Sequence, residues 1–164
     1  MYDLIKLIHV VAVFGFLLAH GISAGVAFKL RSERNLERIR ALLDLSSTSY
    51  SLMYPSLGIL FLAGIVAGFM GSFWSRAWIW VSLILLIAIL MAMYVMGSRY
   101  YSQVRKAVGL PYFAGNKEHP ADPPLSAAEI DALLNQGRSL PPTLLLIGYG
   151  GTAVLAWLMM AKPF

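Results

Sequence analysis

Two histidines are the ionisable side chains that lie within the apolar segments of this sequence, and both belong to the first such segment. His9 and His20 are eleven residues apart, which returns them to nearly one face of a helix, roughly 16 Å apart along its axis. Ionisable residues are rare in apolar spans and mark functional sites by default. A neutral imidazole is also a good ligand for haem iron or copper. We therefore take His9 and His20 as candidate cofactor-binding residues, and His9 as the candidate metal ligand.

A packing role is the alternative for each histidine. His9 lies within two turns of one end of its segment and could hydrogen-bond water, lipid headgroups or a neighbouring serine. His20 precedes Gly21 and could reach a backbone carbonyl of another helix. His119 lies in a polar stretch, where we expect it to be exposed to solvent.

Sulfur offers a weaker signal. Met93 and Met96 share a helix face, and thioethers suit Cu(I) or the sixth position of a haem, although methionine more often fills gaps between helices. The chain has no cysteine, which excludes disulfides, a thiolate nucleophile and cysteine-held zinc or iron–sulfur clusters. The apolar segments also lack carboxylates, so a paired acid/base site is disfavoured and the catalytic residues stay unknown.

The composition excludes an ordinary soluble domain. Hydrophobic residues make up 59% of the 164 residues and charged residues only 13%, about half the usual charged share, and the mean hydropathy is +0.70. A membrane-spanning helix needs about 20 apolar residues. The gaps between charged residues predict a single all-α domain over residues 1–164, a bundle of four transmembrane helices near 4–28, 51–73, 77–98 and 142–161.

The basic residues predict the orientation of this bundle. Ten of the thirteen Lys and Arg fall in the segments 29–50 and 99–141, which four spans place on one side. The positive-inside rule then makes both segments cytoplasmic loops and both termini extracytoplasmic. We expect a multi-pass protein of the bacterial inner (cytoplasmic) membrane whose net charge of +5 reports topology, with lipid and not nucleic acid as its surroundings.

The first loop is expected to continue the first helix. Residues 29–40 carry charged pairs at helical spacing, and Leu36, Ile39 and Leu43 lie on one face. We interpret their arginines as a topogenic run that faces lipid headgroups; a phosphate-binding role is the alternative.

The second loop contains one clear helix signal. Ser126 and Glu129 form a capping box, which predicts a short helix over 127–136 that ends at Gly137. Ile130, Leu133 and Leu134 would form its apolar face. We expect this face to dock on the bundle, because an adjacent apolar surface is available there.

Glycine pairs at four-residue spacing occur in two spans. Gly21 and Gly25, like Gly64 and Gly68, match the motif that lets membrane helices approach closely. Because a small bundle cannot obviously use every such face internally, we predict a homo-oligomer or a partner in a larger membrane complex.

The residues around His9 resemble a known group of proteins. The run Lys6–Val13 followed by Gly15 is similar to the opening of small four-helix bacterial membrane proteins. An uncharacterised family of "predicted integral membrane proteins" is the most similar, also at Tyr54-Pro55, at Trp78-x-Trp80 and at the ending 157–163. This family lies near the CopD-type copper-resistance domains and the HemJ-type protoporphyrinogen oxidases.

This resemblance implies a role for His9. In HemJ-type proteins the matching histidine is taken to serve a b-type haem, together with a lysine of the third helix. Here the third span has neither Lys nor His, a departure that argues against the oxidase activity. We therefore expect a haem-associated or redox-linked membrane protein with His9 as axial ligand. A non-catalytic accessory subunit of a larger membrane complex is the alternative, and a copper-handling component ranks third.

Overall fold

Four helical stretches dominate the computed structural model, which describes residues 1–115 and 117–164. Each is long and apolar enough to cross a bilayer: Tyr2–Leu30, Leu36–Met70, Ala77–Ala107 and Leu140–Ala161. The sequence prediction of four spans is confirmed, although the second and third stretches extend well beyond the predicted ends. These extensions turn much of the expected loops into helix.

Three of these stretches contain more than one helical element, and the first is a single helix. The segments η2 and η3 are π-helical, and η1 is a short 3₁₀ helix between the second and third stretches. In chain order the elements are α1 (Tyr2–Leu30), α2 (Leu36–Thr48), α3 (Tyr50–Met70), η1 (Phe73–Ser75), α4 (Ala77–Ala92), η2 (Met93–Ser98), α5 (Arg99–Ala107), β1 (Tyr112–Ala114), β2 (Lys117–His119), α6 (Ala127–Gln136), α7 (Leu140–Leu145), η3 (Leu146–Gly150) and α8 (Gly151–Ala161).

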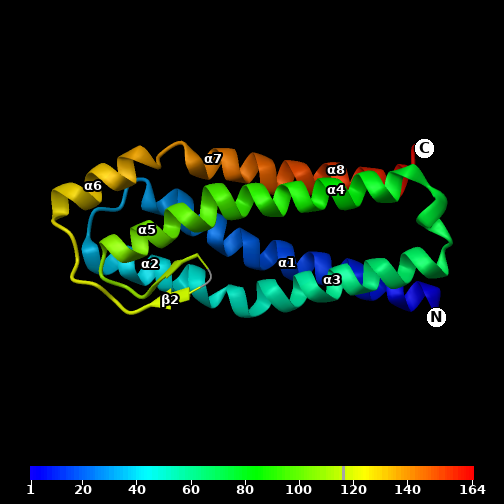
Figure 1. The fold of residues 1–164 in the computed structure, drawn as a ribbon, viewed down its shortest axis with the longest axis horizontal. Helices are drawn as coiled ribbons and strands as arrows, with labels where there is room; N and C mark the ends of the chain where they lie inside the picture. Colours follow the sequence, from blue (N-terminus) through cyan, green and yellow to red (C-terminus); the bar gives the residue numbers. More distant parts are fainter. Residues whose placement is uncertain (116) are drawn as a thin grey trace.

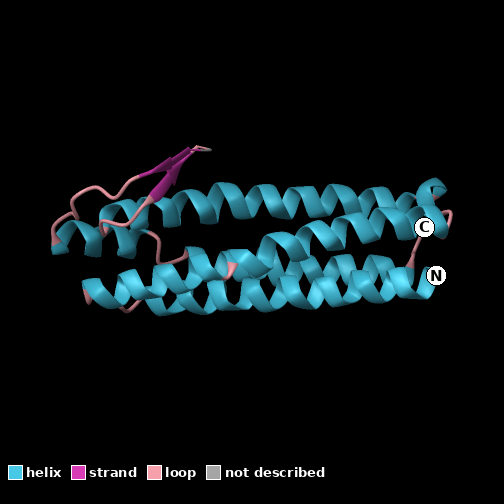
Figure 2. Cartoon of the chain, turned by 90° about the horizontal axis from the view of Figure 1, so that it is seen from below, coloured by secondary structure: helices cyan, strands magenta, loops and turns pink. Residues whose placement is uncertain are grey.

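The long helices run side by side along one axis (Figures 1 and 2). Helix α1 packs along α3, and α4 packs along α8. Both termini lie at one end, which we call the termini end. The opposite end holds α2, α5, α6 and the β1–β2 hairpin. We call it the basic end, because the segments there carry ten of the thirteen Lys and Arg.

The chain breaks after α1, so the prediction that residues 29–40 continue the first helix is wrong. Helix α1 ends at Leu30, and α2 begins only at Leu36. The carboxylate of Glu33 accepts hydrogen bonds from the backbone N–H groups of Arg34 and Asn35. The Asn35 side chain then accepts from the Arg38 N–H as the N-cap of α2. Polar side chains that capture backbone donors in this way compete with helix continuation.

The junction between α2 and α3 is almost continuous. Ser49 is the one residue between them and keeps right-handed helical dihedral angles. The hydroxyls of Ser47, Thr48 and Ser51 donate to carbonyls three residues back, a pattern that bends helices without ending them. The serine-rich stretch 46–51 is therefore helical and continues α2 into α3.

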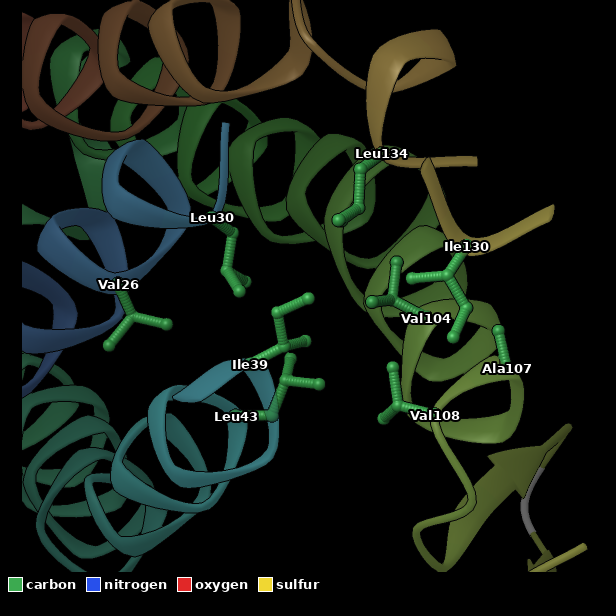
Figure 3. Close-up of a cluster of buried hydrophobic side chains, with 9 residues drawn as sticks. All are labelled: Val26, Leu30, Ile39, Leu43, Val104, Ala107, Val108, Ile130 and Leu134. Carbon is green, nitrogen blue, oxygen red and sulfur yellow. The ribbon is translucent and has the colours of Figure 1, made fainter. Parts of the chain in front are cut away.

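The four largest fully buried side chains of the described residues, Leu30, Ile39, Val104 and Val108, all lie at the basic end. Figure 3 shows this cluster, to which α1, α2, α5 and α6 all contribute. Ile130 and Leu134 of α6 are buried in it. The Ser126–Glu129 capping box is formed, and α6 ends at Gln136 with Gly137 as its C-cap. The predicted short helix and its docking on the bundle are both confirmed.

A small antiparallel hairpin lies beside α5 and was not expected from the sequence. Tyr112 pairs with His119, and Ala114 pairs with Lys117. Ser102 of α5 holds the first strand, because its hydroxyl accepts from the Phe113 N–H at 2.9 Å. Three-residue strands are too short to give a period-two pattern in the sequence.

Candidate functional site

His9 is held by a hydrogen bond to the neighbouring helix α3. Its Nδ1 lies 2.8 Å from the carbonyl oxygen of Leu60. Because a carbonyl oxygen can only accept, Nδ1 carries the proton, and the Nε2 lone pair of the neutral ring stays available. The ring is half-buried. The contact thus fixes the tautomer of an imidazole in the apolar part of the bundle.

The His9 ring fits against a glycine. A Cβ atom at Gly64 would lie 3.2 Å from Cε1 of His9 and 3.4 Å from Nδ1, closer than most side-chain contacts. Buried Ala12 of α1 and Ala63 of α3 complete a small-residue surface on which the two helices approach. Gly64 therefore serves to seat the imidazole between α1 and α3.

His20 has a different partner at the other end of its helix. Its ring stacks on Phe16 at 5.9 Å between centroids and faces Tyr149 at 5.4 Å. A Cβ at Gly148 would lie 2.6 Å from His20 Nε2. Gly148 and Tyr149 belong to the π-helical segment η3. His20 is thus enclosed by aromatic rings and a glycine, and among the described residues it has no hydrogen-bond partner.

The two histidines are therefore not brought together. The eleven-residue spacing puts them at different depths on α1, as the sequence predicted, and the structure adds that one contacts α3 while the other contacts η3. His9 combines a fixed tautomer with an available nitrogen. His20 is packed as part of a helix contact.

Tyr149 was missed by the sequence analysis. Its hydroxyl donates to the Leu17 carbonyl at 3.3 Å, which ties η3 to α1, and Gly21 leaves it room, since a Cβ there would lie 3.0 Å from the hydroxyl oxygen. Leu60 was missed too, because it contributes only its backbone. No sequence pattern identifies a carbonyl that will accept a hydrogen bond from a distant side chain.

A serine network at the junction of α1, α2 and α3 was also missed. The Ser46 hydroxyl donates to Ser23 Oγ at 3.1 Å, Ser23 lies 3.0 Å from Ser49 Oγ, and Ser49 donates to the Ser46 carbonyl at 2.7 Å. Every hydroxyl donor of this network has an acceptor. It stabilises the helix junction and leaves no donor free for a ligand.

The other predicted ligands lie apart from the histidines. Met93 and Met96 belong to η2, towards the basic end, whereas His9 lies near the termini end. His119 is half-buried rather than exposed, because its ring stacks on Tyr112 at 5.3 Å. Within residues 1–115 and 117–164 no group of three or more His, Cys, Asp or Glu could hold a metal ion.

Two arginines of the run expected to face lipid headgroups, Arg34 and Arg40, have partners within the protein. Arg34 forms an ion pair with Asp131 of α6 and donates to Asn135 at 2.9 Å. Arg40 donates from Nε to the Val108 carbonyl at 2.8 Å. These two side chains attach α6 and the end of α5 to residues 34–40. The headgroup interpretation of this basic run stays a prediction.

Glu33 and Glu129 have lowered pKa values in this polar region. Backbone N–H groups, first that of Asn35, hold the pKa of Glu33 below its usual value. The Ser126 hydroxyl and N–H do the same for Glu129. Both shifts favour the charged carboxylate; that of Glu129 belongs to the capping box of α6, and that of Glu33 holds the turn before α2.

No described protein family, no curated protein and no solved structure matches this chain.

Proposed function

We propose that this protein is a multi-pass protein of the bacterial cytoplasmic membrane in which His9 serves as an axial ligand for a b-type haem. The observation that carries this proposal is the hydrogen bond from His9 Nδ1 to the Leu60 carbonyl. Metal-ligating histidines characteristically donate their other ring N–H to a carbonyl or carboxylate, which orients the ring and raises its basicity. His9 is prepared in this way.

The residues around His9 fit an axial ligand. Leu60 holds the tautomer in which Nε2 has the lone pair, and Gly64 leaves space for the ring to adopt this position. A bound haem would supply one-electron redox chemistry to the protein. The protein's part is to present one imidazole nitrogen from an apolar environment.

Neither His20 nor the methionines of η2 lie beside His9 to fill a second axial position. His20 is eleven residues further along α1 and is packed against Gly148, and Met93 lies towards the basic end. The proposal is therefore a single protein ligand per chain. The lack of Lys and His in α4 and η2 gives no support to the HemJ-type oxidase reaction, which we do not propose.

For orientation, we propose that the basic end faces the cytoplasm. Both termini lie at the opposite end (Figure 1), and the strong asymmetry in Lys and Arg favours the basic end as the side that stays inside. A reporter that is active only outside the cytoplasm should then be active when it is fused after Phe164, and a reporter that is active only in the cytoplasm should be inactive there. Activity of a cytoplasmic reporter at this position would overturn the orientation.

An absorption spectrum tests the haem proposal directly. Protein purified in detergent from cells supplied with 5-aminolaevulinate should have a Soret band. The His9→Ala variant should lose it, whereas His20→Ala should keep it. A colourless wild-type protein, or equal loss in both variants, would contradict the assignment of His9.

A non-catalytic accessory subunit is the second candidate. Gly25 of α1 and Gly58 of α3 have nothing within 4 Å of the position a Cβ would take, so helices of a second copy or of another membrane protein could approach there. A colourless protein that co-purifies with a fixed partner would favour this role. The copper-handling alternative has less support, because Met93 and Met96 lie apart from His9.

A further inference from the structure

An apolar groove of about 330 Å³ lies between α3 and α4. Leu57, Gly58 and Phe61 line it from α3, and Leu86, Ile87 and Leu90 line it from α4. The two helices pack on different partners, α3 on α1 and α4 on α8, and Figure 1 shows the α3 and α4 ribbons apart from each other. Gly58 deepens the groove, since a Cβ there would meet nothing within 4 Å.

Polar groups lie at the basic end of this groove. Tyr54 is its one lining residue with a polar side chain, and it lies one turn from the start of α3. On the other wall, Tyr94 follows Ile87 by seven residues, two turns along the same helix face. The guanidinium carbon of Arg99 lies 5.6 Å from the centroid of the Tyr94 ring. Tyr54 thus lines the groove itself, and Tyr94 and Arg99 follow its α4 wall further along the chain, towards the basic end.

Arg99 differs from the ion-paired cations at the basic end. Arg34, Arg40, Arg105 and Lys106 each pair with a carboxylate, whereas Arg99, like Arg38 and Arg138, has no ion pair within the described part of the chain and is exposed. Of these three, Arg99 is the one that lies over a tyrosine ring at the end of a span. Stacking on Tyr94 uses the face of the guanidinium, so its N–H donors stay free. Such a planar fork of donors suits the oxygens of a phosphate.

We propose that the α3–α4 groove binds one anionic phospholipid, with an acyl chain against Gly58 and Ile87 and its phosphate at Arg99. The proposal does not depend on haem binding. The order of the groups matches that of a lipid, because the apolar part of the groove lies within the spans and the cation lies at their basic end. Basic residues next to spans attract anionic headgroups in general. The groove would add a defined place for the acyl chain, so that one lipid molecule is held at this site.

A second copy of the chain fits this surface less well. A two-fold axis along the membrane normal would bring Arg99 of both copies to the same end of the shared face, where the two positive charges repel. An anionic lipid instead neutralises the charge. Charge complementarity thus favours the lipid as the occupant.

Native mass spectrometry of the detergent-purified full chain tests the proposal, with dioleoyl phosphatidylglycerol and dioleoyl phosphatidylcholine as matched probes. One phosphatidylglycerol should be retained with a preference of about fivefold, the value of one basic residue near a lipid surface. Arg99→Gln should remove this preference. Arg138→Gln, which changes an exposed cation at the same end, should preserve it. Gly58→Leu should lower retention of both lipids without lowering the melting temperature, since its side chain enters open space.

Four results would overturn the proposal. Equal losses in Arg99→Gln and Arg138→Gln would mean a diffuse basic surface without a site. Unchanged lipid retention in Gly58→Leu would mean that the groove does not hold the acyl chain. A dimer that Gly58→Leu dissociates would mean that a second copy occupies the groove. Competition by millimolar inorganic phosphate would also count against it, because the proposed site needs the acyl chain for binding.

Discussion

The imidazole of His20 lies so close to Gly148 that a methyl group at that glycine would come within 2.6 Å of Nε2. Gly148 is in the π-helical segment η3, which carries Tyr149 onto the same ring. π-Helical turns are rare and occur often where a helix must present residues to a specific partner. Here the partner is a histidine in the middle of a membrane span.

Gly148→Ala should therefore destabilise the fold. Over-packing of a closed contact typically costs about 1–3 kcal/mol, and we expect a lower melting temperature in detergent. Gly25→Ala is the matched control, because nothing lies within 4 Å of its Cβ position. The double variant Gly148→Ala/His20→Ala should recover most of the loss. Failure of this rescue would show that the glycine matters for some reason other than His20.

Gly64→Leu should displace the His9 ring from Leu60. The new side chain would occupy the space of Cε1, 3.2 Å from the Cβ position, so we expect loss of the hydrogen bond, destabilisation of about 1–3 kcal/mol and loss of any haem bound at His9. Gly58→Leu on the same helix is the control for helix propensity and size. If Gly64→Leu dissociated an oligomer and left the melting temperature unchanged, the role of Gly64 would be intermolecular.

Ile130→Ala should release α6 from the basic end. Its side chain is 6% exposed in the buried cluster of Figure 3, and an Ile→Ala change in a core costs about 2–5 kcal/mol. Amide hydrogen exchange in α6 should accelerate while exchange in α1 stays slow. Leu125→Ala, at a position that is 48% exposed, should leave exchange unaffected. Equal exchange in both variants would mean that α6 is not held by this cluster.

The start of α6 should also respond to acid. The pKa of Glu129 is below its ordinary value of 4.5, chiefly because the Ser126 hydroxyl bonds its carboxylate. A lowered folded-state pKa means that the capping box stabilises the helix above pH 4.5 and that this contribution fades as the pH falls through the folded value. As the pH falls through this range, hydrogen exchange at the N-terminus of α6, corrected for its intrinsic pH dependence, should become faster. Glu129→Gln should abolish this pH response; an unchanged response would assign it to another group.

The four spans and the α6 helix were predictable because their signals are local. A run of about 20 apolar residues has few alternatives to a spanning helix, and the Ser126–Glu129 spacing directly satisfies the end of a helix. The break at 31–35 was not predictable from periodicity, because Glu33 and Asn35 capture backbone donors in a stretch whose charges otherwise match a helix.

The candidate site was predictable only in part. His9 and His20 could be identified because ionisable side chains are rare in apolar spans. Their partners could not, because the Leu60 carbonyl of α3 and Gly148 of η3 lie 51 and 128 residues away in the sequence. Glycines that were expected at an oligomer interface are used within the chain instead: Gly64 faces His9, and Gly68 faces Trp74 and Ile79. Such pairings arise from the packing of distant helices.

The central claim, that His9 Nε2 binds haem iron, is tested most directly by replacing the side chain and returning its ring from solution. Purified wild-type protein titrated with haemin should develop a Soret band that saturates at one haem per chain, and His9→Gly should not. Added imidazole should restore the band in His9→Gly, because the space of the lost ring lies beside Leu60 and Gly64. A Soret band of equal strength in the wild type and His9→Gly, or no band in the wild type at all, would contradict the claim.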